Sequence, residues 1–168
     1  MRIYLFRHGE ALSKGDPSVS SDAERPLIEE GVRRTRQSAE GLVKLGLSFD
    51  AILTSPWMRA RQTAQIVAEV LEFPGKPEVM EQLAGDRSVE DAMSALATHD
   101  KQDHIMLVGH QPLLGEIAAY CLSLSTAMQV DMKKSGIVCV EVARIPPKNP
   151  GTLIFAMSAK QLRLLRDA

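Results

Sequence analysis

The chain begins with a run, residues 2–6, that is apolar from Ile3 to Phe6 and has no helical periodicity. A run of this kind is typical of a strand covered on both faces, and such strands belong to parallel sheets flanked by helices. A second apolar run of the same kind spans residues 105–108. A histidine beside a glycine follows each run, as His8-Gly9 and as Gly109-His110. The pattern constrains the chain to an α/β fold in which two buried strands each end near a histidine.

Helical and strand patterns fill the segment between these two runs. Apolar residues recur at spacings of four and three from Ile28, which predicts an amphipathic helix that ends near Gly46. Residues 49–53 predict a short strand. Ser55 and Pro56 then offer a helix N-cap and a first-turn proline, so a second helix is expected to begin there.

The rest of the chain continues the alternation. A brief strand is expected around Val79, and a serine cap predicts a third helix over residues 88–96. Residues 114–121 follow the second buried strand with a helical pattern. Residues 137–142 and 153–157 predict an antiparallel strand pair. The expected fold is a three-layer α/β/α sandwich with a mostly parallel central sheet and an antiparallel C-terminal strand pair.

Length and composition limit the classes of function. With 168 residues, 45% of them hydrophobic, the chain can build the core of a single domain over residues 1–168. A formal net charge of −1 provides no broad basic field for nucleic acid, and no apolar stretch approaches the roughly 20 residues of a membrane helix. Cys121 and Cys139 lie in a helical and a strand pattern, which favours buried thiols over a disulfide. We expect a cytoplasmic protein without nucleic-acid or membrane partners.

The ends of parallel strands share one edge of a sheet, where ligands of such folds bind. We therefore expect His8, Arg59 and His110 to converge there, together with Arg7. A phosphoryl group presents three anionic oxygens, so its transfer needs a nucleophile among fixed positive donors. His8 is the candidate nucleophile, with His110 expected to donate as an imidazolium. Gly9 is expected to leave room for the close approach of a phosphate.

The ring of His8 must be neutral to attack phosphorus. Two neighbouring guanidinium groups, those of Arg7 and Arg59, are expected to lower its pKa toward that form. The ring nitrogen that does not attack is expected to donate to a backbone carbonyl, which would fix the tautomer.

Four motifs lie where the expected strands, loops and helices meet: Phe6–Glu10, Glu24–Gly31, Leu53–Thr63 and Val108–Leu113. Together they resemble the histidine phosphatase (phosphoglycerate mutase-like) superfamily, and most closely its short bacterial phosphohistidine phosphatases of the SixA type. The resemblance implies that His8 is transiently phosphorylated. It also implies that Arg7, Arg59 and His110 complete the phosphate pocket, with no metal and no other cofactor.

The resemblance also bears on the substrate. Longer members of the superfamily carry an inserted segment that covers the substrate and supplies a carboxylic acid, but the segment from Gly75 to Ser88 is too short for a large lid. Glu81 and Asp86 are the nearest carboxylates, and both are better explained as solvated loop charges. Without a strong acid an alkoxide is hard to expel, whereas an imidazole leaves with less help. These points favour phosphohistidine on a protein as the substrate.

Several alternatives stay open at this stage. The same His8 could serve a small-molecule phosphomonoesterase, and a binding module for phosphoproteins without catalysis is a weaker alternative. A metal site is disfavoured because arginines surround both histidines and no His-x-x-x-His spacing occurs. A nucleotide-binding Rossmann domain would need Gly-x-Gly-x-x-Gly after the first strand. Arg25 is a further candidate for the rim of the site, ranked below the four, and Glu10 either orients Arg7 or is a loop charge.

Overall fold

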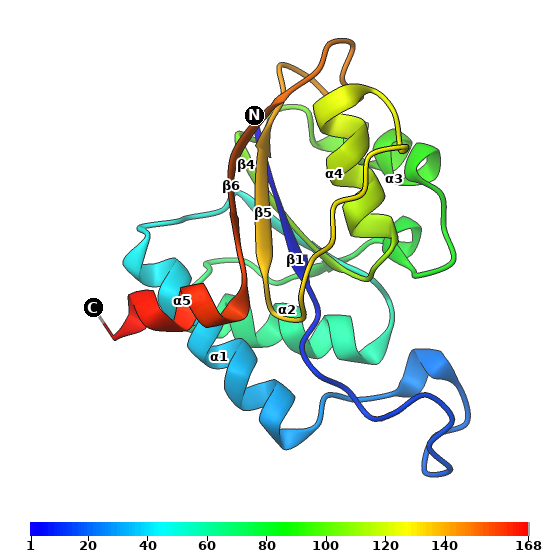
Figure 1. Cartoon of the computed structure of the whole chain (residues 1–168), viewed down its shortest axis with the longest axis vertical. Coiled ribbons are helices and arrows are strands. Elements are labelled where there is room, and N and C mark those ends of the chain that lie inside the picture. Colours follow the sequence, from blue (N-terminus) through cyan, green and yellow to red (C-terminus); the bar gives the residue numbers. More distant parts are fainter. Residues whose placement is uncertain (168) are drawn as a thin grey trace.

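A six-stranded sheet forms the centre of the molecule in the computed structural model, which describes residues 1–167 (Figure 1). The strands lie in the order β3-β2-β4-β1-β5-β6. Their bounds are β1 (Arg2–Arg7), β2 (Ala51–Thr54), β3 (Glu78–Val79), β4 (His104–Gly109), β5 (Ile137–Glu141) and β6 (Thr152–Met157). The first four are mutually parallel, whereas β5 pairs antiparallel with both β1 and β6. The expected sheet is confirmed.

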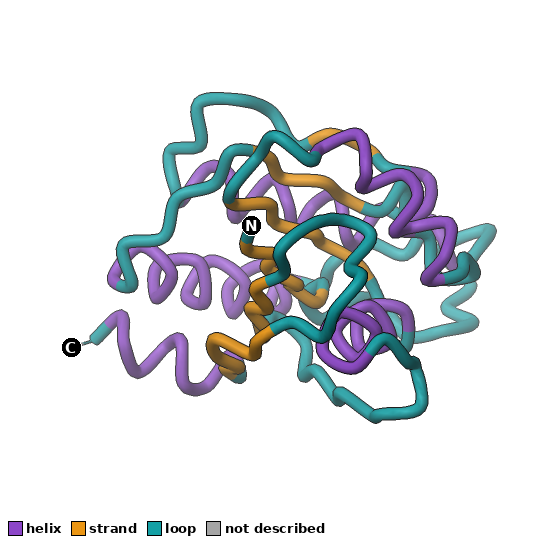
Figure 2. Tube along the Cα trace, turned by 90° about the horizontal axis from the view of Figure 1, so that it is seen from above, coloured by secondary structure: helices purple, strands orange, loops and turns teal. Residues whose placement is uncertain are grey.

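Helices cover both faces of this sheet, as the view in Figure 2 shows. On one face lie α1 (Glu29–Lys44), α2 (Met58–Val70) and α5 (Ala159–Arg166), and on the other α3 (Val89–Leu96) and α4 (Leu113–Ser123). Because side chains alternate along a strand, Tyr4 and Phe6 pack toward α1 and α2 while Ile3 and Leu5 pack toward α4. Three short 3-10 turns complete the chain: η1 (Asp22–Glu24), η2 (Glu81–Leu83) and η3 (Ala97–His99).

The start of the second helix differs from the prediction. α2 begins at Met58, its N-cap is Trp57, and no side chain caps it. Ser55 therefore does not cap the helix as expected. Its backbone N–H instead donates to the Val108 carbonyl at 2.9 Å, which holds it in line with the end of β2. Its hydroxyl turns toward His110, with 2.7 Å between Ser55 Oγ and His110 Nε2.

The last helix is an element that the sequence reasoning missed. α5 begins with a capping box between Ser158 and Gln161, and its Leu162 is fully buried in the core shared with α1. The serine cap of the third helix, by contrast, is confirmed, because the Asp91 N–H donates to Ser88 Oγ at 3.1 Å. α5 closes one end of the α1 and α2 layer.

The two cysteines are buried thiols, as expected from the sequence. Cys121 and Cys139 are both buried and unpaired. Burial raises the pKa of the Cys121 thiol to about 12 and that of Cys139 to about 11, so neither is a reactive thiolate. Within residues 1–167, none of the helices combines the length and the apolar character that crossing a bilayer requires.

Candidate active site

The pairing of three strands brings the candidate residues to one edge of the sheet. Arg7 lies opposite Gly109 in the β1–β4 pair, and Thr54 lies opposite Val108 in the β2–β4 pair. The residues that follow these strand ends are therefore neighbours: His8, Ser55 and His110. The backbone N–H of His8 donates to the Gly109 carbonyl at 3.0 Å. The expected convergence of the strand ends is confirmed.

The ring of His8 is held in one tautomer. Its Nδ1 lies 2.7 Å from the Gly9 carbonyl, which can only accept, so Nδ1 carries the proton. The opposite nitrogen, Nε2, then presents a lone pair, and Arg59 Nε–H donates to it at 3.2 Å. The side chains of both residues are buried, His8 at 7% and Arg59 at 3% exposure. The expected hydrogen bond to a backbone carbonyl is confirmed.

The His8 ring is neutral, for a reason that differs from the expectation. Its pKa is lowered to about 3, and burial is the main cause, opposed by the hydrogen bond to the Gly9 carbonyl. The charges of Arg59 and Arg7 lower the pKa further but contribute less than burial. The expected lowering of the His8 pKa by the two guanidinium groups is confirmed, and burial, which the sequence reasoning did not name, contributes more.

The protonation state of His110 also differs from the expectation, which was a charged imidazolium. Burial, with smaller contributions from His8 and Arg59, lowers its pKa to about 2. The ring is therefore neutral, and its centroid lies 5.0 Å from that of His8. With Nε2 bonded to Ser55 Oγ at 2.7 Å, His110 Nδ1 stays buried without a partner.

Arg7 lines the same site from the end of β1. Its Nη1 donates to the Met132 carbonyl at 2.5 Å, while its Nε is buried without a partner. Buried polar atoms are almost always hydrogen-bonded, so exceptions need a reason. Two of the exceptions in the described part of the chain, Arg7 Nε and His110 Nδ1, lie in this site. Unpartnered nitrogens around a neutral histidine form a cluster suited to an anionic group.

Asp22 belongs to the site, although the sequence reasoning did not single it out. Arg59 donates from Nη1 to the Asp22 carbonyl at 2.6 Å and from Nη2 to Asp22 Oδ2 at 3.1 Å. Arg25 Nε donates to the other carboxylate oxygen at 2.8 Å, and the same guanidinium bonds the Leu12 carbonyl. Arg25 therefore holds Asp22, which in turn holds Arg59.

The carboxyl group of Asp22 is ionised in this arrangement. Burial acts to raise its pKa, but the hydrogen bond from Arg25 and the charges of Arg59 and Arg25 outweigh it, so the pKa is lowered. An ionised carboxylate cannot donate a proton. Asp22 is therefore suited to positioning Arg59 and unsuited to acid catalysis.

Trp57 is a second residue that the sequence reasoning missed. Its ring centroid lies 4.6 Å from that of His110, and the guanidinium carbon of Arg59 lies 4.6 Å from the same ring. A Cβ at Gly85 would come within 2.9 Å of the Trp57 ring, so the loop after η2 packs directly on it. The tryptophan thus packs against two site residues at once. Its position two residues before Arg59 in the sequence was a usable signal.

The structure gives a further reason why position 9 needs a residue without a side chain. A Cβ there would collide with the Thr35 hydroxyl and come within 3.1 Å of the Gly31 carbonyl, both in α1. The glycine therefore lets α1 approach the strand end closely. Its carbonyl still takes part in the site through His8 Nδ1.

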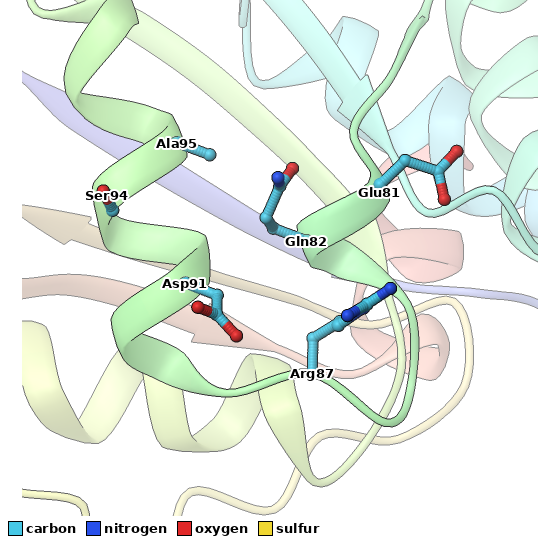
Figure 3. Close-up of a pocket in the computed structure, with 6 residues that line it drawn as sticks. All are labelled: Glu81, Gln82, Arg87, Asp91, Ser94 and Ala95. Atoms are coloured by element: carbon cyan, nitrogen blue, oxygen red, sulfur yellow. The ribbon is translucent and has the colours of Figure 1, made fainter.

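The three carboxylates considered from the sequence, Glu10, Glu81 and Asp86, make their contacts outside the phosphate site. Glu81 lines a separate cavity of about 340 Å³ between η2 and α3, together with Arg87 (Figure 3). The side chain of Asp86 is 75% exposed and lies 4.0 Å from Arg87. Glu10 pairs with Lys134 at 3.2 Å, so its carboxylate contacts a lysine and not Arg7. Loop charges are the better interpretation for Glu81 and Asp86.

Comparison with known proteins agrees with this geometry. The model of the histidine phosphatase superfamily (branch 1) matches residues 3–87. The chain is 38% identical over 166 residues to an uncharacterized protein of Picosynechococcus sp., covering 96% of this chain and 99% of that one. It is 30% identical over 121 residues to phosphohistidine phosphatase SixA of Escherichia coli K12, covering 71% and 73%.

Comparison of the fold with solved structures also identifies a relative of the SixA type. The structure of the protein histidine phosphatase SixA complexed with tungstate superimposes with a TM-score of 0.83 at 26% identity, covering 96% of this chain and 99% of that one. The chain therefore belongs to the histidine phosphatase superfamily. Within the superfamily, it is a phosphatase close to SixA in sequence and in structure.

Proposed function

We propose that the protein hydrolyses phosphohistidine on a protein substrate through a phosphorylated His8 intermediate. One observation carries this proposal: His8 Nε2 has a lone pair because Nδ1 donates to the Gly9 carbonyl. The name of the relative SixA, a phosphohistidine phosphatase, supports the same substrate class.

In the first step His8 Nε2 attacks phosphorus. A bond forms between Nε2 and phosphorus while the bond between phosphorus and the substrate imidazole breaks. The departing nitrogen keeps the electron pair, and the imidazole leaves as a neutral ring when its other nitrogen is protonated. Because one phosphorus–nitrogen bond replaces another and the leaving group has a pKa near neutrality, little acid assistance is required.

Arg7, Arg59 and His110 stabilise the charge on the three phosphoryl oxygens during this step. Arg59 Nε, which donates to the Nε2 lone pair at 3.2 Å, turns to a phosphoryl oxygen as that lone pair becomes a bond. His110 accepts from the Ser55 hydroxyl at Nε2 and offers the Nδ1 proton to the anion. The site thus has donors for the oxygens and one nucleophile for phosphorus.

In the second step water hydrolyses the intermediate. An oxygen–phosphorus bond forms, the bond between phosphorus and His8 Nε2 breaks, and the electron pair returns to the ring. One proton of the water passes to the inorganic phosphate that leaves. The roles of the residues require no metal, and in residues 1–167 no cluster of three or more His, Cys, Asp or Glu side chains is arranged to hold one.

A small phosphate ester is the second candidate substrate, and its hydrolysis requires an additional group in the site. Its alkoxide leaving group needs a proton donor. Asp22 is ionised, Asp86 is largely exposed, and Glu81 lines a different cavity with α3. The positions of these three carboxylates therefore favour the phosphohistidine substrate.

The test compares phosphate release from a phosphorylated histidine-containing transfer domain and from a phosphoserine ester. We expect efficient release from the first only, loss of that release in His8→Ala, and no effect of a chelator. His99→Ala is the matched control, because His99 lies in η3 and bonds Gln102 at 3.0 Å. Equal release from the ester, or full activity of His8→Ala, would contradict the proposal.

A further inference from the structure

A basic groove lies beside the site, on the side of Arg7. Its volume is about 410 Å³, and its walls come from the end of β1, α1, the turn before β5 and the start of α5. Figure 1 shows these segments at the same end of the sheet. Its positively charged lining residues are Arg7, Arg34, Lys133, Lys134, Lys160 and Arg163. Against these six cations stands one lining carboxylate, Glu10.

Local carboxylates neutralise only some of these charges. Glu10 pairs with Lys134 at 3.2 Å, and Lys133 pairs with Asp131 at 2.5 Å. Arg34 pairs with Glu30 at 2.5 Å and lies 3.9 Å from Glu10. Lys160 in the first turn of α5 and Arg163 in its last turn form no ion pair with any residue of the described chain. The groove therefore keeps a positive charge in a protein whose formal net charge is −1.

The groove shares one residue, Arg7, with the phosphate site. Arg7 belongs to both, since its guanidinium lines the groove and its Nε is an unpartnered nitrogen of the site. The Ser135 N–H donates to the Arg7 carbonyl at 3.0 Å, which fixes the turn that carries Lys133 and Lys134 against the end of β1. A molecule whose phosphoryl group reaches His8 therefore brings its neighbouring surface to this groove.

We propose that the groove binds acidic side chains that flank the phosphohistidine on the substrate protein, an inference that rests on the proposed function. Exposed ammonium and guanidinium groups act on charged partners mainly through the rate and orientation of encounter. They would therefore affect a phosphoprotein strongly and a small phosphoryl donor weakly. The phosphate pocket supplies the chemistry, and the groove supplies preference for a substrate with carboxylates nearby.

The test compares two substrates that share the same phosphorus–nitrogen bond: a phosphorylated histidine-containing transfer domain and N-phosphoimidazole. The variant Lys160→Glu/Arg163→Glu reverses two charges of the groove outside the phosphate pocket. Arg144→Glu/Lys148→Glu is the matched control. It makes the same change in net charge in the loop between β5 and β6, at the opposite end of the sheet from Arg7.

We expect kcat/KM on the phosphoprotein to fall about tenfold or more in the groove variant, mainly through KM, with kcat/KM on N-phosphoimidazole unchanged. The control should match the wild type on both substrates. Adding salt should lower kcat/KM of the wild type on the phosphoprotein and reduce the difference between the wild type and the groove variant.

Two results would overturn the inference: an unchanged groove variant, or an equal loss on both substrates. The proposed function fails separately. It fails if the wild type turns over N-phosphoimidazole but releases no phosphate from the phosphoprotein.

Discussion

His8 and His110 make the folded state sensitive to acid. Their pKa values are about 3 and about 2 in the folded protein, against about 6.5 in an unfolded chain. The unfolded chain therefore takes up protons that the folded protein cannot bind. The free energy of unfolding has its full value above pH 6.5 and falls as the pH drops from there toward 3.

We expect each histidine to contribute up to about 1.4 kcal/mol per pH unit to this loss. Urea unfolding of the wild type at pH 7 and pH 5 measures the slope. His8→Gln/His110→Gln should show a much flatter pH dependence, whereas His99→Gln, outside the site, should keep the wild-type slope. A double variant as acid-sensitive as the wild type would show that other groups cause the loss.

Ser55 acts on the site through His110. Ser55→Ala removes the hydroxyl that lies 2.7 Å from His110 Nε2 and leaves a buried ring nitrogen unpaired. We expect a loss of about 1–3 kcal/mol in stability. We also expect kcat/KM to fall about tenfold, the equivalent of about 1.4 kcal/mol, because the His110 ring loses the contact that holds its orientation.

Ser38→Ala is the matched control for that change. Ser38 Oγ is buried without a partner in the core, so removing it should leave both stability and kcat/KM close to the wild-type values. If the two serine variants behave alike, the contact with His110 has no role in the site.

At the scale of elements, α5 ties the groove to the core. Leu162 is fully buried between α5 and α1, while Leu164 on the same helix is 62% exposed. We expect Leu162→Ala to cost about 2–5 kcal/mol and Leu164→Ala no more than about 0.5 kcal/mol. Chemical denaturation of the two variants measures the difference. Similar losses in both would mean that α5 is not anchored through Leu162.

Elements with a long, strong pattern could be predicted from the sequence. The buried strands β1 and β4 contain continuous apolar runs, the amphipathic helix α1 carries apolar positions at a clear period, and all three lie where expected. α5 spans only eight residues and Leu162 is the one of them that is buried, although its capping box and its amphipathic pattern were usable signals. α2 begins later than predicted, and the hydroxyl of Ser55, the expected cap, bonds His110, which follows another strand. Local patterns cannot reveal such long-range partners.

The same distinction holds for the site. His8, Arg59 and His110 follow strand ends that a parallel sheet must bring together, so their convergence could be predicted. Asp22 lies on a short turn in a long loop, and nothing local indicates that this loop folds back onto Arg59. The neutral state of His110 depends on burial by the whole fold, which explains why the sequence suggested an imidazolium.

At the scale of the whole molecule, an anion that binds the site should stabilise the fold. Arg7 Nε and His110 Nδ1 have no hydrogen-bond partner within the described chain, and a bound anion would provide one. Inorganic phosphate at a hundred times its Kd should stabilise the protein by about 2.7 kcal/mol, seen as a rise in Tm. Arg59→Met should abolish that rise, and Lys148→Met, in the distant β5–β6 loop, should preserve it.

The control for that measurement is chloride at the same ionic strength. A rise in Tm that chloride reproduces, or one that survives in Arg59→Met, would mean that phosphate binds elsewhere.

The central claim is that the phosphoryl group passes onto His8. The most direct measurement is an alkaline quench during turnover of a radioactively labelled phosphohistidine protein, followed by peptide mapping. The account predicts label on Nε2 of His8, none in His8→Ala, and labelled inorganic phosphate appearing as the labelled peptide decays. Turnover with no label on His8, or label on another residue, would contradict it.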